Sequence, residues 1–283
     1  MQQRRLADLT VSAIGLGAMP LSVQGRPDEP QAMRTVHAAL DAGVTLIDTA
    51  DAYSVGHDDV GHNERLVAKA LATWGGDASQ VLVATKGGHT RPPDGSWALD
   101  GSPQHLRAAC EASLQALGVE AIGLYQYHRP DPGVPYAESL GALEELRQEG
   151  KVRLVGISNA DVDQIELALA TTQLAAVQNE FSPAFRSSRP ELELCARHGI
   201  AFLPWSPLGG ATRAAGLGRE HAAFAEVAAE RGVSPQQVAL AWELAQADVV
   251  IPIPGARRSA SILDSVAACD LELTVDELAR LAA

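Results

Sequence analysis

The chain has little cysteine, fewer basic than acidic residues and no long apolar run. Its three cysteines, Cys110, Cys195 and Cys269, lie far apart without CxxC spacing, so we expect neither a disulfide framework nor a bound metal. The net charge of -13 argues against nucleic acid and anionic membranes as partners. No stretch approaches roughly eighteen apolar residues, and none follows the arginines of residues 1–10, so we expect no membrane span, no signal peptide and a cytoplasmic location.

The sequence also lacks a linker. No segment rich in Ser, Gly and Pro and no block of like charge divides the 283 residues, of which 46% are hydrophobic and 20% charged. Such a composition can bury a large core, and α/β barrels of this size form a single unit. We therefore expect one domain over residues 1–283.

Short runs rich in Val, Ile and Leu alternate with longer stretches of helical spacing. The predicted strands are 13–17, 44–48, 81–86, 122–127, 152–157, 176–178, 201–205 and 249–253. The predicted helices are 31–42, 63–72, 103–117, 137–149, 162–171, 189–198 and 234–247, with further helices after 258 and from 275. Eight such βα repeats predict an α/β fold, the (β/α)8 TIM barrel. Two short extended pieces around Ala7 and Asp8 predict an N-terminal hairpin that caps the barrel floor.

Local residues mark the ends of these helices. Ser102-Pro103 and Ser234-Pro235 place a capping hydroxyl before a proline in the first helical position. Glycines that can adopt the left-handed conformation follow four helices, at Gly43, Gly118, Gly150 and Gly199.

Polar residues interrupt the apolar runs where the predicted strands end. Asp48 closes TLID, Lys86 closes VLVATK, and His128 follows LYQY. Later strands end in Ser158-Asn159, Gln178-Asn179 and Trp205-Ser206. In a barrel the carboxyl ends of all strands meet on one rim, where active sites are built, so we expect these side chains to converge.

The segments TLIDTADAY, VATKGG, YHRPD, GISN, VQNEFS and WSPLG occur in this order and span nearly the whole chain. Together they resemble the aldo-keto reductase family. In that family an Asp, a Tyr, a Lys and a His form a catalytic tetrad, and the matching residues are Asp48, Tyr53, Lys86 and His128. The resemblance implies reduction of small-molecule aldehydes or ketones by NADPH, with Tyr53 as the proton donor.

These residue types suit carbonyl reduction. Hydride addition leaves negative charge on the carbonyl oxygen, so an acid must supply a proton there. A free tyrosine, with a pKa of about 10, is a weak acid, and a cation such as Lys86 eases its deprotonation. Asp48 would keep Lys86 charged, and His128 would donate a hydrogen bond to the substrate oxygen. Taken singly, the same residues could be a buried ion pair, a packed tyrosine and a structural histidine.

The chain lacks a Rossmann fingerprint, because Gly15-Leu16-Gly17 is not followed by a third glycine. The resemblance instead assigns the nicotinamide carboxamide to Ser158, Asn159 and Gln178. It assigns the nicotinamide ring to Trp205, where relatives more often have tyrosine. The segment from Ser206, Pro207, Leu208 and Gly209 to residue 218 would cover the pyrophosphate, although a solvent loop is the alternative.

A basic pair precedes one of the last predicted helices. Gly255, Ala256, Arg257 and Arg258 lead into that helix, where a phosphate can bind the helix start and the guanidinium groups. This arrangement favours NADPH over NADH, although either arginine could be a solvated surface charge. The resemblance places Ser261 and Ser265 near the adenine, where relatives often carry Gln and Asn.

The loop 87–101 follows Lys86, so Trp97 and also Met19 could line a substrate pocket, although surface packing explains Trp97 equally well. The sequence ends soon after the helix predicted from 275, so we expect an uncovered pocket with broad specificity. The expected assembly is a monomer or a weak homo-oligomer.

Two other functions remain compatible with a barrel. One is a regulatory or redox-sensing subunit that binds NADP(H) with little turnover. The other is a metal-dependent hydrolase, which would need a His-x-His pair at an early strand end. The first predicted strand leads instead into Ala18-Met19-Pro20.

Overall fold

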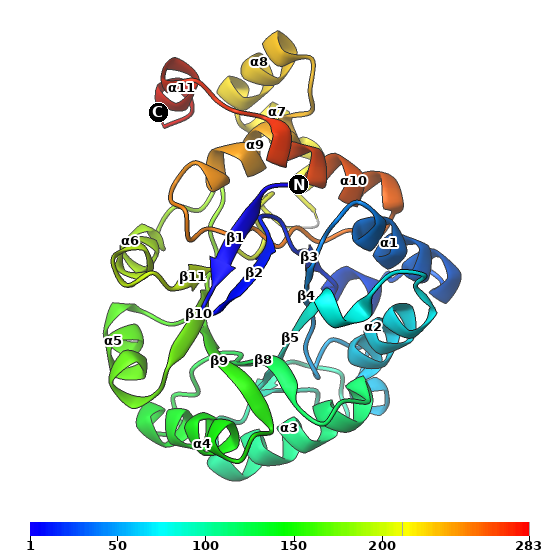
Figure 1. Ribbon diagram of the computed structural model, residues 1–283, viewed down its shortest axis with the longest axis vertical. Helices are drawn as coiled ribbons and strands as arrows, with labels where there is room; N and C mark the ends of the chain where they lie inside the picture. The colour runs from blue at the N-terminus through cyan, green and yellow to red at the C-terminus, as the bar shows by residue number, and fades with distance from the viewer. Residues whose placement is uncertain (211, 283) are drawn as a thin grey trace.

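The computed structural model describes residues 1–210 and 212–282. Its main sheet has seven parallel strands in the order β11-β10-β9-β8-β5-β4-β3, and this sheet curves into a barrel (Figure 1). The strands are β3 (Leu16–Gly17), β4 (Leu46–Asp48), β5 (Leu82–Gly87), β8 (Ile122–Tyr127), β9 (Val152–Ser158), β10 (Leu174–Gln178) and β11 (Ala201–Phe202). The prediction of a (β/α)8 barrel is confirmed.

Residues 249–255 occupy the eighth strand position of the barrel but form only isolated bridges, at Val250 and Gly255. The prediction of a regular strand over 249–253 is therefore wrong. The amide of Ile251 donates to the carbonyl of Phe202 at 2.9 Å, on the β11 side. On the β3 side the carbonyls of Pro252 and Pro254 accept from Gly15 and Gly17 at 2.9 and 3.0 Å. Because proline has no N–H, this side of the ladder carries acceptors only, and it still closes the barrel.

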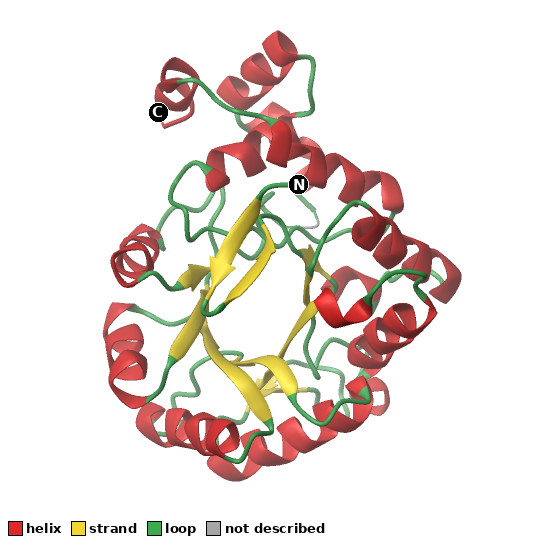
Figure 2. Ribbon diagram, in the orientation of Figure 1, coloured by secondary structure: helices red, strands yellow, loops and turns green. Residues whose placement is uncertain are grey.

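Helices form an outer ring around the sheet (Figure 2). They are α1 (Glu29–Asp41), α2 (His62–Thr73), α3 (Pro103–Leu117), α4 (Tyr136–Gln148), α5 (Val162–Thr171), α6 (Arg189–His198), α9 (Pro235–Leu244) and α10 (Ser259–Ala267). The predicted caps are confirmed at Ser102 and Ser234, whose hydroxyls accept from the amides of His105 and Gln237. Gly118 and Gly199 end α3 and α6 in the left-handed conformation.

Two helices were not predicted. They are α7 (Leu217–Glu220) and α8 (Ala222–Arg231), and α8 lies beside α11 (Val275–Ala282) outside the ring (Figure 1). Arg231 binds Glu277 at 2.6 Å between these two helices. The loop after β5 contains the antiparallel pair β6 (His89–Thr90) and β7 (Ala98–Leu99). Short 3-10 turns lie at Met19–Leu21, His57–Asp59, Ala78–Gln80, Ala214–Gly216 and Ala268–Asp270.

The N-terminal hairpin consists of β1 (Gln3–Leu6) and β2 (Leu9–Ser12), paired in antiparallel register. It crosses the middle of the barrel in Figure 1. Leu6 and Val11 are buried in one cluster with side chains of the barrel interior, among them Leu46, Leu82 and Ile251. The hairpin therefore closes the amino-terminal end of the barrel, as predicted, and a pocket opens at the carboxyl ends of the strands.

Candidate active site

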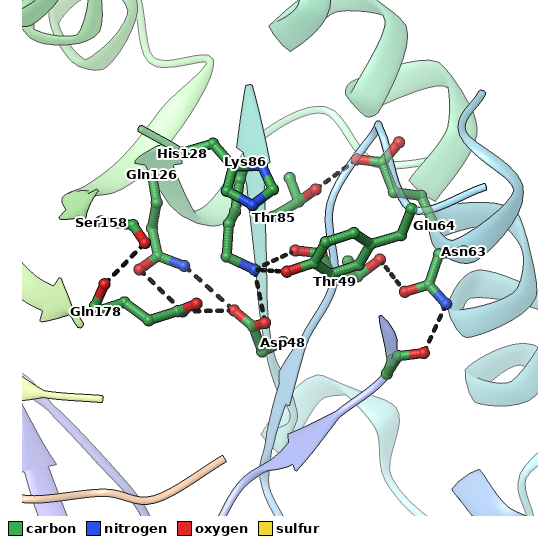
Figure 3. A network of polar contacts seen from close by, with 12 residues as sticks. Asp48, Thr49, Asn63, Glu64, Thr85, Lys86, Gln126, His128, Ser158 and Gln178 are labelled. Atoms are coloured by element: carbon green, nitrogen blue, oxygen red, sulfur yellow. Dashed lines mark hydrogen bonds and ion pairs between the residues drawn. The ribbon is translucent and has the colours of Figure 1, made fainter. Parts of the chain in front are cut away.

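Lys86 is the centre of a buried polar network at the carboxyl end of the strands (Figure 3). Its ammonium donates to Asp48 Oδ2 at 2.6 Å, to Tyr53 Oη at 2.9 Å and to the carbonyl of Thr49 at 2.9 Å. Burial alone would lower the pKa of Lys86, but the charge of Asp48 and the Tyr53 phenol outweigh burial and raise it. The side chain is therefore a fixed cation with three acceptors.

Tyr53 lies in the loop after β4 and is 6% exposed. Burial raises its pKa above the ordinary value of 10.0, and the opposing effect of Lys86 is smaller. Lys86 acts in the direction expected from the sequence, because it lowers the pKa of Tyr53, but burial, which was not considered there, has the larger effect. The phenol consequently stays protonated at neutral pH, which is the state that a proton donor needs.

His128 follows β8, and its ring meets the ring of Tyr53 edge-on with centroids 5.5 Å apart. Burial, with smaller contributions from Lys86, His89 and Arg129, lowers the pKa of His128 well below 6.5. The imidazole is therefore neutral and keeps one N–H to donate. Its Nδ1 is buried and has no hydrogen-bond partner within residues 1–210 and 212–282.

The second carboxylate oxygen of Asp48, on β4, is held by two amides that project from β8 and β10, strands that are not adjacent to β4 in the sheet. Gln178 Nε2 donates to Asp48 Oδ1 at 2.8 Å, and Gln126 Nε2 donates to the same oxygen at 3.3 Å (Figure 3). Gln126 was not predicted, because it lies within its strand rather than directly after it. A glutamine inside the apolar strand IGLYQY was the available signal.

The three residues assigned to the carboxamide lie next to this network. Ser158 Oγ donates to the carbonyl of Gln178 at 2.7 Å. Asn159 has a left-handed backbone with φ of 58°, and its amide donates to the carbonyl of His128 and to Ser158 Oγ, each at 3.0 Å. The structure thus brings Ser158, Asn159 and Gln178 together with the four proposed catalytic side chains.

A pocket of about 300 Å³ opens above these groups. It is lined by thirteen of the residues singled out from the sequence, namely Met19, Asp48, Tyr53, Trp97, His128, Ser158, Asn159, Gln178, Trp205, Ser206, Pro207, Leu208 and Gly255. His89 and Arg129 also line it and were not predicted. Met19 and Trp97 are 40% and 46% exposed, so both form part of the pocket wall rather than of the core.

Other residues assigned to the cofactor lie outside this lining. Gly209 follows it in the loop with φ of 79°. Ala256 is buried, whereas Arg257 and Arg258 are exposed at the start of α10. Ser265 is 5% exposed and donates to the carbonyl of Ser261 at 3.1 Å, so its hydroxyl is engaged within α10.

Residues 1–210 and 212–282 contain neither a candidate metal centre nor a candidate membrane span. No group of three or more His, Cys, Asp or Glu side chains is placed to hold a metal ion there. Within the same residues, no helix has the length and apolar character needed to cross a membrane.

Comparisons with known proteins show the family of this chain. The sequence model of the "Aldo/keto reductase family" matches residues 13–283. An uncharacterized oxidoreductase of Schizosaccharomyces pombe is 33% identical over 281 residues, which cover 98% of this chain and 88% of that protein.

Solved structures share the fold over nearly the whole chain. The glycerol dehydrogenase from Gluconobacter oxydans superposes with a TM-score of 0.85 at 28% identity, covering 99% of this chain and 94% of that one. An aldo/keto reductase from Klebsiella pneumoniae, solved in complex with NADP and acetate, gives a TM-score of 0.81 at 28% identity over 99% and 93% of the two chains. The chain described here therefore belongs to the aldo/keto reductase family of oxidoreductases.

Proposed function

We propose that this protein reduces aldehydes or ketones to alcohols with NADPH, and that Tyr53 donates the proton. The observation that carries the proposal is the position of the Lys86 ammonium, which lies 2.9 Å from the Tyr53 hydroxyl and 2.6 Å from Asp48 at the base of the pocket. An ordinary buried ion pair needs no phenol as a third member. A proton donor that must bear negative charge after transfer does need an adjacent cation.

Each side chain has a distinct task in this proposal. The Tyr53 O–H bond breaks and its proton passes to the carbonyl oxygen, while Lys86 stabilises the phenolate that remains. Asp48 holds Lys86 in its charged state and in position. The neutral His128 donates its N–H to the substrate oxygen and so orients the carbonyl group.

The residues around the pocket suit a nicotinamide cofactor, which when bound supplies the hydride. Ser158, Asn159 and Gln178 offer amide and hydroxyl groups to a carboxamide on one side of the pocket. Trp205 presents a half-buried ring, and its buried Nε1 has no partner among the described residues. Arg257 and Arg258 at the start of α10 favour the additional phosphate of NADPH.

The test is the oxidation of NADPH in the presence of an activated aromatic aldehyde, compared between wild type and Tyr53→Phe. We expect kcat to fall by about 10²- to 10⁴-fold, the range for loss of a general acid, while the affinity for NADPH is unchanged. Tyr136→Phe is a matched control, because the Tyr136 hydroxyl is buried without a partner in the described residues and lies on α4, away from the pocket lining. Parallel assays with NADH measure the cofactor preference.

Two results would contradict the proposal. Full turnover in Tyr53→Phe would remove Tyr53 as the proton donor. If the wild type binds NADPH and yet reduces no compound in a broad carbonyl panel, a regulatory or redox-sensing NADP(H)-binding subunit becomes the better explanation.

A further inference from the structure

Arg129 gives the pocket a positive charge that the reaction itself does not require. The charged residues that line the pocket are Asp48 and Arg129. Asp48 is neutralised by its ion pair with Lys86, and both histidines of the lining have lowered pKa values and are neutral. Within residues 1–210 and 212–282, no carboxylate lies within 4.0 Å of the Arg129 guanidinium. A chain with a net charge of -13 thus leaves an unpaired cation in its pocket wall.

Arg129 is exposed and lies next to two of the proposed site residues. It directly follows His128, and its Nη2 donates to Asn159 Oδ1 at 3.2 Å. The amide nitrogen of Asn159 in turn donates to the carbonyl of His128. One contact holds the guanidinium beside the strand end, and most of its five N–H donors remain available to a ligand.

The charge of Arg129 is felt by the groups around the pocket. After burial, Lys86 and His89, it contributes to the lowered pKa of His128. It also helps to lower the pKa of His89, which burial brings to about 4. Glu180 senses the same charge, although burial prevails and raises the pKa of that carboxyl. An anion near this arginine would therefore meet a positive potential.

The remaining wall of the pocket is largely apolar, with Met19, Trp97 and Trp205 among its members. A substrate that fits would have an apolar or aromatic body between its carbonyl group and a charged end. We propose that Arg129 determines specificity by pairing with a carboxylate on the substrate, so that this enzyme prefers carbonyl compounds that carry an anionic group. This inference rests on the proposed reductase function.

The experiment compares 4-formylbenzoate with its methyl ester, which has the same ring and aldehyde but no charge. In the wild type we expect kcat/KM to be higher for the carboxylate. Arg129→Gln keeps a donor for Asn159 and removes the charge, so kcat/KM should fall about tenfold for 4-formylbenzoate and stay unchanged for the ester. Arg129→Lys should retain most of the preference, and rising salt should weaken it.

Arg153→Gln is the matched control. Arg153 is also an exposed arginine, but it lies near the start of β9 at the opposite end of the barrel, where it pairs with Asp8. An equal loss for acid and ester in Arg129→Gln, together with a higher KM for NADPH, would assign Arg129 to the cofactor and overturn the inference. No change with either aldehyde would show a solvated surface charge and overturn it too. In both cases continued reduction of the ester shows that the proposed reductase function stands independently.

Discussion

The protonation states of three side chains are set by where each one lies. Lys86 is fully buried, but Asp48 and the Tyr53 phenol raise its pKa, so it remains charged. His128 is buried near that charge and is neutral. Tyr53 is buried between them and stays protonated. The three side chains therefore already have the protonation states that the proposed carbonyl reduction needs before a substrate arrives.

These pKa directions predict the pH dependence of the reduction. The pKa of His128 lies below 6.5 and that of Tyr53 above 10.0, so neither group changes its charge in the interval between these values. With saturating NADPH and aldehyde, kcat should be constant from about pH 6.5 to about pH 9 and should fall only in more alkaline solution. A decline centred on pH 6.5 would show that His128 titrates normally and is not shielded as the structure indicates.

At the scale of elements, α9 contains a feature that the reaction does not explain. Glu243 is completely buried in this helix, and neither of its carboxylate oxygens has a partner in the described part of the chain. Burial raises its pKa well above 4.5. The folded protein thus keeps a proton on Glu243 that the unfolded chain releases once the pH exceeds about 4.5.

Glu243→Gln should remove this linkage. Because the pKa of Glu243 is raised in the folded state, this side chain does not lower the free energy of unfolding below about pH 4.5. Between that pH and the folded-state pKa, it lowers the free energy of unfolding by up to about 1.4 kcal/mol per pH unit. Denaturant unfolding at pH 4, 6 and 8 should show that the free energy of unfolding of the variant rises relative to that of the wild type as the pH increases. Glu166→Gln, at an exposed position of α5, should show no such trend. A pH-independent difference for Glu243→Gln would mean that the carboxyl ionises freely in the fold.

Elements whose ends depend on local chemistry could be predicted from the sequence. Helices α3, α5 and α6 begin and end at the predicted residues, and Ser102, Gly118 and Gly199 supply capping contacts within a few residues. Elements that depend on distant partners were harder to predict. The segment 249–255 has the apolar pattern of a strand, but its two prolines limit its pairing, and α8 has an alanine-rich sequence with little periodicity.

The candidate site shows the same division. The resemblance and the strand-end pattern led to the residues that meet around Lys86, because a parallel barrel brings all its strand ends to one rim. The contacts that hold them were not visible in the sequence. Thr49 contributes only its carbonyl oxygen, Gln126 lies inside a strand, and the net pKa direction of Tyr53 depends on burial.

For the whole molecule, the closed end of the barrel matters as much as the open end. Residues at the two ends of the chain complete one structure, since β1 and β2 seal the floor and the segment 249–255 joins β11 to β3. Neither half of the sequence contains all the strands that close the barrel. We therefore propose that residues 1–283 form a single cooperative domain.

Leu6→Ala tests this proposal, because Leu6 is fully buried where the hairpin meets the barrel interior. The cavity should lower the free energy of unfolding by about 2–5 kcal/mol and shift one calorimetric transition to lower temperature. Activity at low temperature should be retained, since the pocket lies at the opposite end of the strands. Leu167→Ala, at a 40% exposed position on α5, should change little. If the hairpin unfolded in a separate transition while the transition of the barrel stayed at the same temperature, the hairpin would not be part of the cooperative unit. The single-domain proposal would then fail.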